Sequence, residues 1–120
     1  MKPDPDQIPE EDLLEHIVDH LCEEQAEAVA ALSDSEIRRR AALGLARARA
    51  NGFEFPEPIT AFVTLMFLVA PDFDRHPEIA KVLSDRKAAP AERLKNLFAR
   101  TKEEHWEQAA ANSAGWDALA

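Results

Sequence analysis

The longest apolar run of the chain reads ITAFVTLMFLVA at residues 59–70, and only Thr60 and Thr64 interrupt it. These 12 residues fall short of the roughly 18 to 20 that a membrane-spanning helix needs. Periodicity alone does not distinguish a buried strand from a buried helix. The Leu, Met and Ala content and the lack of any other convincing strand favour a helix that ends at Pro71. Because it is apolar all round, we expect this helix at the centre of the fold with neighbours on several sides.

Two further helices are predicted on the N-terminal side of this run. From about Pro9 the apolar residues fall on one broad side at 100° per residue, with an interruption at Glu24 and Gln25 where the helix bends or ends. Ser33 and Glu36 have the spacing of a capping box, which predicts a new helix start. Asn51 and Gly52 end that helix, because glycine adopts the left-handed conformation without steric cost.

Proline punctuates the rest of the chain. Residues 53–58 are expected to form a rigid connector, and Pro77 and Pro90 suit the first turns of two helices. The second of these places three residues inward, namely Leu94, Leu97 and Phe98. Thr101 with Glu104 predicts a last capping box, and Trp116 is the one aromatic of a loose tail, from which its ring can tuck back.

The sequence therefore predicts an all-α fold, a compact single-domain bundle of five to six helices around a central apolar helix. The expected organisation is a flexible N-terminal arm over 1–9, a helical domain over 10–112 and a C-terminal tail over 113–120. A chain of 120 residues suits one domain.

Charge is strongly negative and unevenly spread. The formal net charge is −9, with 12 acidic residues against Lys2 in residues 1–36 and five arginines without an acid in residues 37–49. This balance disfavours nucleic acid and anionic membranes as partners. Cys22 is the single cysteine, and the N-terminal residues contain no apolar stretch behind a basic end. We therefore expect a cytoplasmic protein.

Reaction motifs are missing. Three glycines cannot form a dinucleotide fingerprint or a P-loop. His16 and His20 have metal-ligand spacing, but Cys22 lies about half a turn away, so solvated histidines are favoured over structural zinc.

A second candidate set combines three acids with a lysine, namely Asp72, Asp74, Glu78 and Lys81, and it lacks the spacing of a metal-dependent nuclease. Loop acids that cap the following helix are the better interpretation. We expect no catalytic, cofactor-binding or metal-binding residues and no enzymatic activity.

The arginines of residues 37–49 are the strongest binding candidates. Arg40 and Arg47 lie on one flank of their helix, and Arg38 and Arg49 lie on the other. One interpretation pairs them with the acidic first helix. The other makes them a partner-binding surface together with the loop at residues 71–77, which contributes three residues, Asp72, Phe73 and Asp74. For Phe73, the alternative to an interface anchor is a plug in the core.

Five segments carry a resemblance to a known family. They read AVAALSDSEI at 28–37, GLARARANG at 44–52, FVTLMFLVAPDFDRHP at 62–77, VLSD at 82–85 and PAERL at 90–94. In order, they resemble small bacterial proteins encoded in type VI secretion clusters beside spike, adaptor and effector genes. The chain departs from the family at Ala70-Pro71, where relatives are expected to have glycine before proline.

The resemblance implies a non-enzymatic adaptor or co-chaperone that loads or holds a secreted effector, and it carries over no catalytic residue. The expected partner is a protein: an effector, an adaptor or a spike protein. The alternatives are an immunity protein that neutralises a cognate toxin, for which the acidic charge is suited, and a helical module of another pathway.

Overall fold

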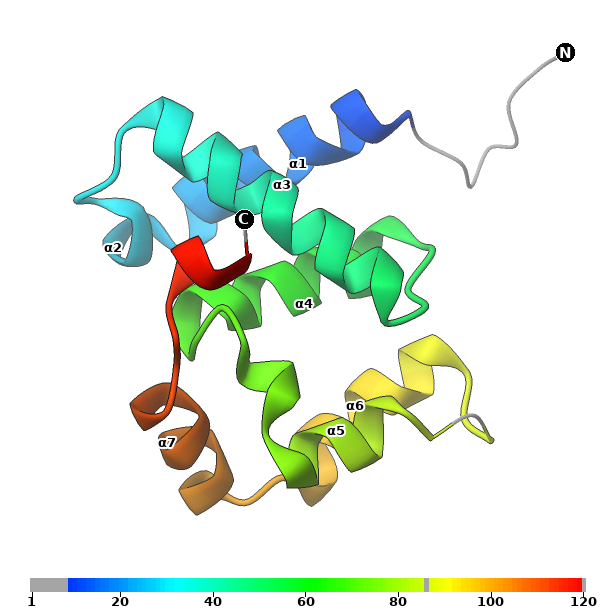
Figure 1. Ribbon diagram of the computed structural model, residues 1–120. Helices are drawn as coiled ribbons and strands as arrows, with labels where there is room; N and C mark the ends of the chain where they lie inside the picture. Colours follow the sequence, from blue (N-terminus) through cyan, green and yellow to red (C-terminus); the bar gives the residue numbers. More distant parts are fainter. Residues whose placement is uncertain (1–8, 86, 120) are drawn as a thin grey trace, which may run out of the picture.

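The fold is all-α, as the sequence predicts. The computed structural model describes residues 9–85 and 87–119, and within them it contains no strand (Figure 1). The α-helices are α1 (Glu10–Glu24), α2 (Ala26–Val29), α3 (Asp34–Ala50), α4 (Pro56–Leu68), α5 (Pro77–Leu83), α6 (Pro90–Arg100) and α7 (Glu103–Ala111). Two 3-10 turns are η1 (Phe73–Arg75) and η2 (Trp116–Leu119).

The first helix breaks where its apolar side is interrupted. α1 ends at Glu24, and the backbone of Gln25 leaves the helical region before the single turn of α2. This break explains why the described residues form seven α-helices and exceed the expected five or six. α1 buries Leu13, Ile17 and Leu21, which recur every four residues and form one apolar side.

Close packing against α4 fixes the position of α3. The Ser33 hydroxyl accepts a hydrogen bond from the Glu36 N–H at 3.2 Å, so the predicted N-cap is confirmed. Halfway along α3, a Cβ atom on Gly44 would lie 3.0 Å from Val63 Cγ1 and 3.3 Å from Met66 Sδ. Glycine therefore lets the two helices approach closely. The helix ends as predicted, since Gly52 has a φ of 91°.

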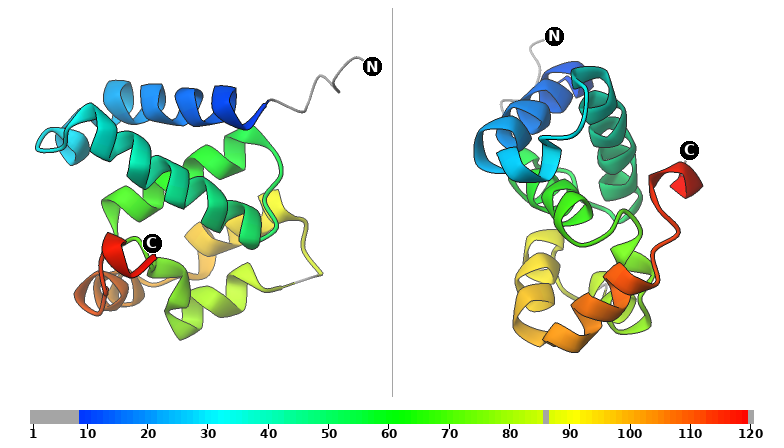
Figure 2. Two further views of the ribbon diagram at one scale, coloured as in Figure 1. Left: turned by 45° about the horizontal axis from the view of Figure 1, so that its top comes forward. Right: turned by 90° about the vertical axis from the view of Figure 1, so that its left-hand side faces the viewer.

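The central helix starts earlier than predicted. α4 begins at Pro56, so the last three residues of the expected connector, 56–58, are helical. Prolines at the first and third helical positions are tolerated because the N–H groups of the first turn have no intrahelical partner. α4 contacts α1, α3 and α6, and four of its most buried side chains are Ile59, Phe62, Val63 and Met66. It lies between α1 and α3 on one side and α5 and α6 on the other (Figure 2).

Prolines open α5 and α6 as predicted, with Pro77 and Pro90 in their first turns. The start of α7 differs, because its N-cap is Lys102 and not Thr101. The Lys102 N–H donates to His105 Nδ1 at 3.3 Å. A histidine ring therefore takes the place that the predicted box gives to Glu104.

The two ends of the chain differ in how much of them the structure describes. All but the last residue of the expected N-terminal arm lie outside the described residues. At the other end, Trp116 packs on Phe67 of α4, with ring centroids 4.8 Å apart, and the Arg40 guanidinium lies 5.5 Å from its ring centroid. The tail therefore folds back over α3 and α4, as Figure 1 shows for η2.

Candidate functional site

Two of the predicted binding arginines face α1. Arg38 forms an ion pair with Glu11 at 2.7 Å, with 44% and 82% of the two side chains exposed. Arg49 pairs with Glu10 and also donates to the carbonyl of Glu54 at 2.9 Å. These contacts follow the interpretation in which arginines on this flank of α3 pair with the acidic first helix.

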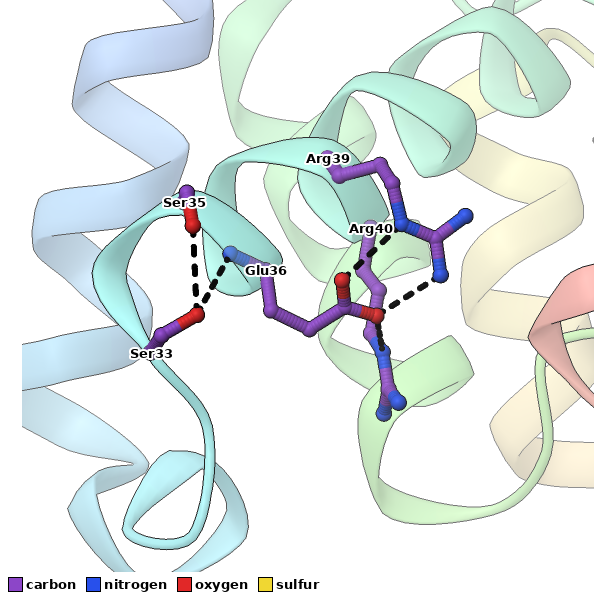
Figure 3. A network of polar contacts seen from close by, with 5 residues as sticks. All are labelled: Ser33, Ser35, Glu36, Arg39 and Arg40. Carbon is purple, nitrogen blue, oxygen red and sulfur yellow. Dashed lines mark hydrogen bonds and ion pairs between the residues drawn. The ribbon is translucent and has the colours of Figure 1, made fainter.

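Arg40, on the other flank, belongs to a network at the start of α3. Glu36 accepts from Arg39 Nε at 2.9 Å and Nη2 at 2.7 Å, and from Arg40 Nε at 2.9 Å (Figure 3). The hydrogen bonds from Arg39 are the largest cause and the hydrogen bond from Arg40 is the second, and together they lower the pKa of Glu36 to about 2. The carboxylate thus stays ionised and holds Arg40 close to Trp116.

Arg47 joins α3 to the loop at residues 71–77. Its Nε donates to Asp74 Oδ1 at 2.8 Å, and Asn51 Nδ2 donates to Asp74 Oδ2 at 3.1 Å. The Asp74 side chain is 8% exposed and the Arg47 side chain 21%. The structure therefore brings two predicted site residues together, but in a pair that is mostly shielded from solvent.

Phe73 is fully buried, so the structure corrects its interpretation as an exposed interface anchor. Its ring centroid lies 5.1 Å from that of Phe62 and 6.0 Å from that of Trp106. The short 3-10 turn η1 aims the side chain inward, where it joins α4 to α7. Phe73 is the core plug that the sequence left as its alternative.

Asp72 binds the backbone of the C-terminal segment. It is 8% exposed, and its Oδ2 accepts from the Ala114 N–H at 2.9 Å. Burial by itself raises the pKa of this carboxyl, but hydrogen bonds from Ala114 and Ser113 and the charge of Arg75 outweigh burial, so the pKa is lowered. Its Oδ1 has no hydrogen-bond partner among the described residues.

A shallow cavity of about 320 Å³ adjoins Asp72, and Arg75, His76 and Gln108 also line it. His76 Nδ1 accepts from the Glu78 N–H at 3.2 Å, so its proton lies on Nε2, which donates to Gln108 Oε1 at 2.8 Å. The imidazole therefore joins α5 to α7. These polar groups are used in holding the fold.

A different surface has the properties of a binding groove, and sequence reasoning missed it. Between α4 and α6 lies an open cavity of about 430 Å³ lined by Glu57, Pro58, Ala61, Leu94, Lys95 and Phe98. Between α4 and α1 lies a second, of about 400 Å³, lined by His16, His20, Pro56, Glu57, Thr60 and Ala61. Glu57 and Ala61 belong to both, so we call the pair the α4 groove.

The α4 groove lies over the N-terminal half of α4. Glu57 and Ala61, which line both cavities, are one helical turn apart, and both are at least partly exposed. α1 and α6 form the two walls, and Figure 2 shows both on the same side of the molecule with α4 between them.

Phe98 is the prominent apolar side chain of this surface. It was predicted to point inward with Leu94 and Leu97, yet 57% of it is exposed, whereas Leu97 is fully buried. Leu94 is buried as well, and Phe98 lies one helical turn beyond it, so the helical phase of α6 does not separate the two. The elements that pack on α6 cover Leu94 and Leu97 and leave Phe98 open. Trp106 lies beside the Phe98 ring, at a centroid distance of 6.5 Å. No local sequence signal distinguishes Phe98 from Leu94.

The acidic and histidine sets do not assemble into a metal centre. Asp72, Asp74 and Glu78 each bind a different partner, the last pairing with Lys81 at 3.1 Å. In the part of the chain that the structure describes, no three His, Cys, Asp or Glu residues are placed to hold a metal ion.

Over residues 9–85 and 87–119, no helix has both the length and the apolar character to cross a membrane. Comparison of the chain with family models, curated proteins and solved structures gives no match to any of the three.

Proposed function

We propose that this chain is a non-enzymatic protein-binding factor that docks a partner in the α4 groove. The observation that carries the proposal is the exposure of Phe98 above an apolar cavity of about 430 Å³. Aromatic side chains are enriched among residues that anchor protein partners, and they do so in pockets that exclude water. A folded monomer gains nothing from leaving such a ring in water.

The partner follows from the family resemblance of the sequence. We propose a secretion effector, an adaptor or a spike protein of a type VI cluster, with this chain acting as an adaptor or co-chaperone. An all-helical domain with an apolar groove is suited to hold an apolar segment of another chain until it is transferred.

The face formed by Arg40, Arg47 and the loop at residues 71–77 is a weaker candidate. Both arginines are engaged within the chain, with Glu36 and Asp74. A partner would have to break these contacts before it gained its own. The α4 groove requires no such exchange.

An immunity protein that blocks a toxin is the second candidate. The observation in its favour is the net charge of −9, because complementary charge speeds association with a basic toxin. The test is expression of each neighbouring toxin gene in a heterologous bacterium. Rescue of growth by this chain supports immunity, whereas binding without rescue supports the adaptor function.

Matched variants test the groove itself. Phe98 lies in it, whereas Phe55, at 52% exposure, lines neither cavity. Each product of the neighbouring secretion genes is co-expressed with tagged wild type, Phe98→Ser and Phe55→Ser. We expect a partner to co-purify with wild type and Phe55→Ser but to be lost with Phe98→Ser. Equal recovery with all three chains would place the interface elsewhere.

A further inference from the structure

The α4 groove is built from helices. The α4 residues that line its two cavities lie between Pro56 and Ala61, roughly 9 Å of helix. The walls are helices too, and the described residues offer no strand edge to which an extended peptide could add. An amphipathic helix therefore suits this surface better than an extended peptide.

The α1 wall of the groove adjoins an acidic surface. His16 and His20 line the cavity, and the exposed residues Asp12, Asp19 and Glu23 each lie three or four positions from one of these histidines on the same helix. All three carboxylates are exposed, and within the described residues none has an ion pair. Glu57 adds a fourth acid at the floor.

The opposite wall has a different character. Lys95 is its cation, beside the apolar surface of Leu94 and Phe98. A helix that lies in the groove thus meets apolar side chains and one lysine from α6, Glu57 from α4 and two histidines from α1, with the exposed carboxylates of α1 beyond these histidines. The excess of acid, together with the net charge of −9, sets the sign of a complementary ligand.

From this arrangement we infer that the ligand of the α4 groove is a basic amphipathic helix of another protein. Its apolar side packs against Ala61 and Phe98, and its Lys and Arg residues face the α1 wall. The inference rests on the proposed function, because it names the class of partner segment for the same groove. An acidic helix and a second copy of this chain are the competing occupants.

Two peptides of opposite charge test the inference. Both are fluorescein-labelled 14-residue peptides, with leucines at every third or fourth position and either lysine or glutamate elsewhere, a pattern with one apolar side. Binding to the full chain is followed by fluorescence anisotropy. We expect the Leu/Lys peptide to bind at least tenfold more tightly than the Leu/Glu peptide.

Variants separate specific binding from general attraction to an acidic protein. Phe98→Ser should weaken binding of the Leu/Lys peptide at least tenfold, and Phe55→Ser less than twofold. Asp19→Lys with Glu23→Lys should weaken it at least fivefold. The same charge change at Glu104 and Glu107 of α7, which line neither cavity, should weaken it less than twofold.

Each opposing outcome overturns the inference in its own way. If both peptides bind with equal affinity and Phe98→Ser weakens the binding of both, the groove is a protein-binding site without the inferred preference for basic ligands. No binding of either peptide refutes the helical ligand, while the proposed function is still decided by co-purification. A concentration-dependent dimer in sedimentation, abolished by Phe98→Ser, would show that a second copy occupies the groove.

Discussion

At the scale of single residues, the Arg47–Asp74 pair is the charged contact with the most consequence for stability. Asp74 is 8% exposed and receives hydrogen bonds only from Arg47 and Asn51 among the described residues. In Arg47→Ala this carboxylate is still shielded from solvent, but it keeps only the hydrogen bond from Asn51. We expect a loss of about 2–3 kcal/mol, below the roughly 3–5 kcal/mol of a fully buried pair, measured by urea unfolding.

Arg38→Ala is the matched control. Its partner Glu11 is 82% exposed, and exposed pairs contribute at most about 1 kcal/mol. If both substitutions lower the free energy of unfolding by the same small amount, Asp74 is accessible to water in solution and the pair does not secure the loop.

Glu36 gives a prediction on acid stability. Its pKa is lowered from 4.5 to about 2, so the folded state holds the ionised form more strongly than the unfolded state does. The stability from its contacts with Arg39 and Arg40 is therefore complete above pH 4.5 and lost as the pH falls through about 2. Glu36→Gln should be less stable than wild type at pH 6, and the difference should shrink steadily towards pH 2.

NMR titration of the Glu36 carboxyl carbon measures the same pKa directly. A midpoint near the ordinary value of 4.5 would mean that Arg39 and Arg40 do not hold the carboxylate in solution.

At the scale of elements, the crossing of α3 over α4 depends on one glycine. A Cβ atom at Gly44 would lie 3.0 and 3.1 Å from the two methyl groups of Val63. Gly44→Leu adds three carbons beyond that atom into a closed contact, and we expect a loss of at least about 3 kcal/mol or failure to fold.

Gly44→Ala is the informative partner of that variant. It gains about 1 kcal/mol of helix propensity and loses a comparable amount if Val63 must move by a few tenths of an ångström. We expect a change within about 1 kcal/mol of wild type. A Gly44→Leu chain as stable as wild type by thermal unfolding would show that α3 and α4 separate easily.

Element boundaries were predictable where backbone chemistry decides them. Ser33, Gly52, Pro77 and Pro90 act through their own hydroxyl, missing Cβ or ring, so local sequence suffices. Pro56 was misjudged because proline is equally suited to a connector and to a first helical turn.

The candidate site was less predictable because it depends on distant partners. The sequence gives the flank of α3 on which each arginine lies, but not that Arg47 meets Asp74, 27 positions away. Phe98 was misplaced and Phe73 was left open between an interface anchor and a core plug, since burial is decided by which elements pack together and not by the residue itself. The α4 groove required three helices to be placed before it could be recognised.

At the scale of the whole molecule, folding pairs some of the acidic residues of α1 with arginines of α3 and leaves others exposed. The arginines of α3 neutralise the α1 carboxylates that face them, Glu10 and Glu11. Among the described residues, the carboxylates of Asp12, Asp19 and Glu23 on the same helix have no ion-pair partner. The α3 arginines therefore stabilise the fold, and the carboxylates of α1 that they do not pair with are the reason for proposing a basic ligand.

The last prediction concerns how the C-terminal segment joins the rest of the molecule. Trp116 packs on Phe67 at 4.8 Å, Arg40 lies over its ring, and Asp72 binds the Ala114 N–H. These contacts join the last turn to α3, α4 and the loop at residues 71–77. Trp116→Ala removes two of them from a half-buried position, and we expect a loss of about 1–2 kcal/mol, less than the roughly 3–5 kcal/mol for a fully buried tryptophan.

A double-mutant cycle distinguishes docking from a general effect of the substitution. Phe67→Ala in the Trp116→Ala background should cost less than Phe67→Ala alone, with a coupling of about 0.5–1.5 kcal/mol, since the ring pair is lost only once. Additive losses would mean that the two rings do not touch in solution. In that case Trp116 would not pack on α4, and the hydrogen bond from the Ala114 N–H to Asp72 would have to hold the C-terminal segment without it.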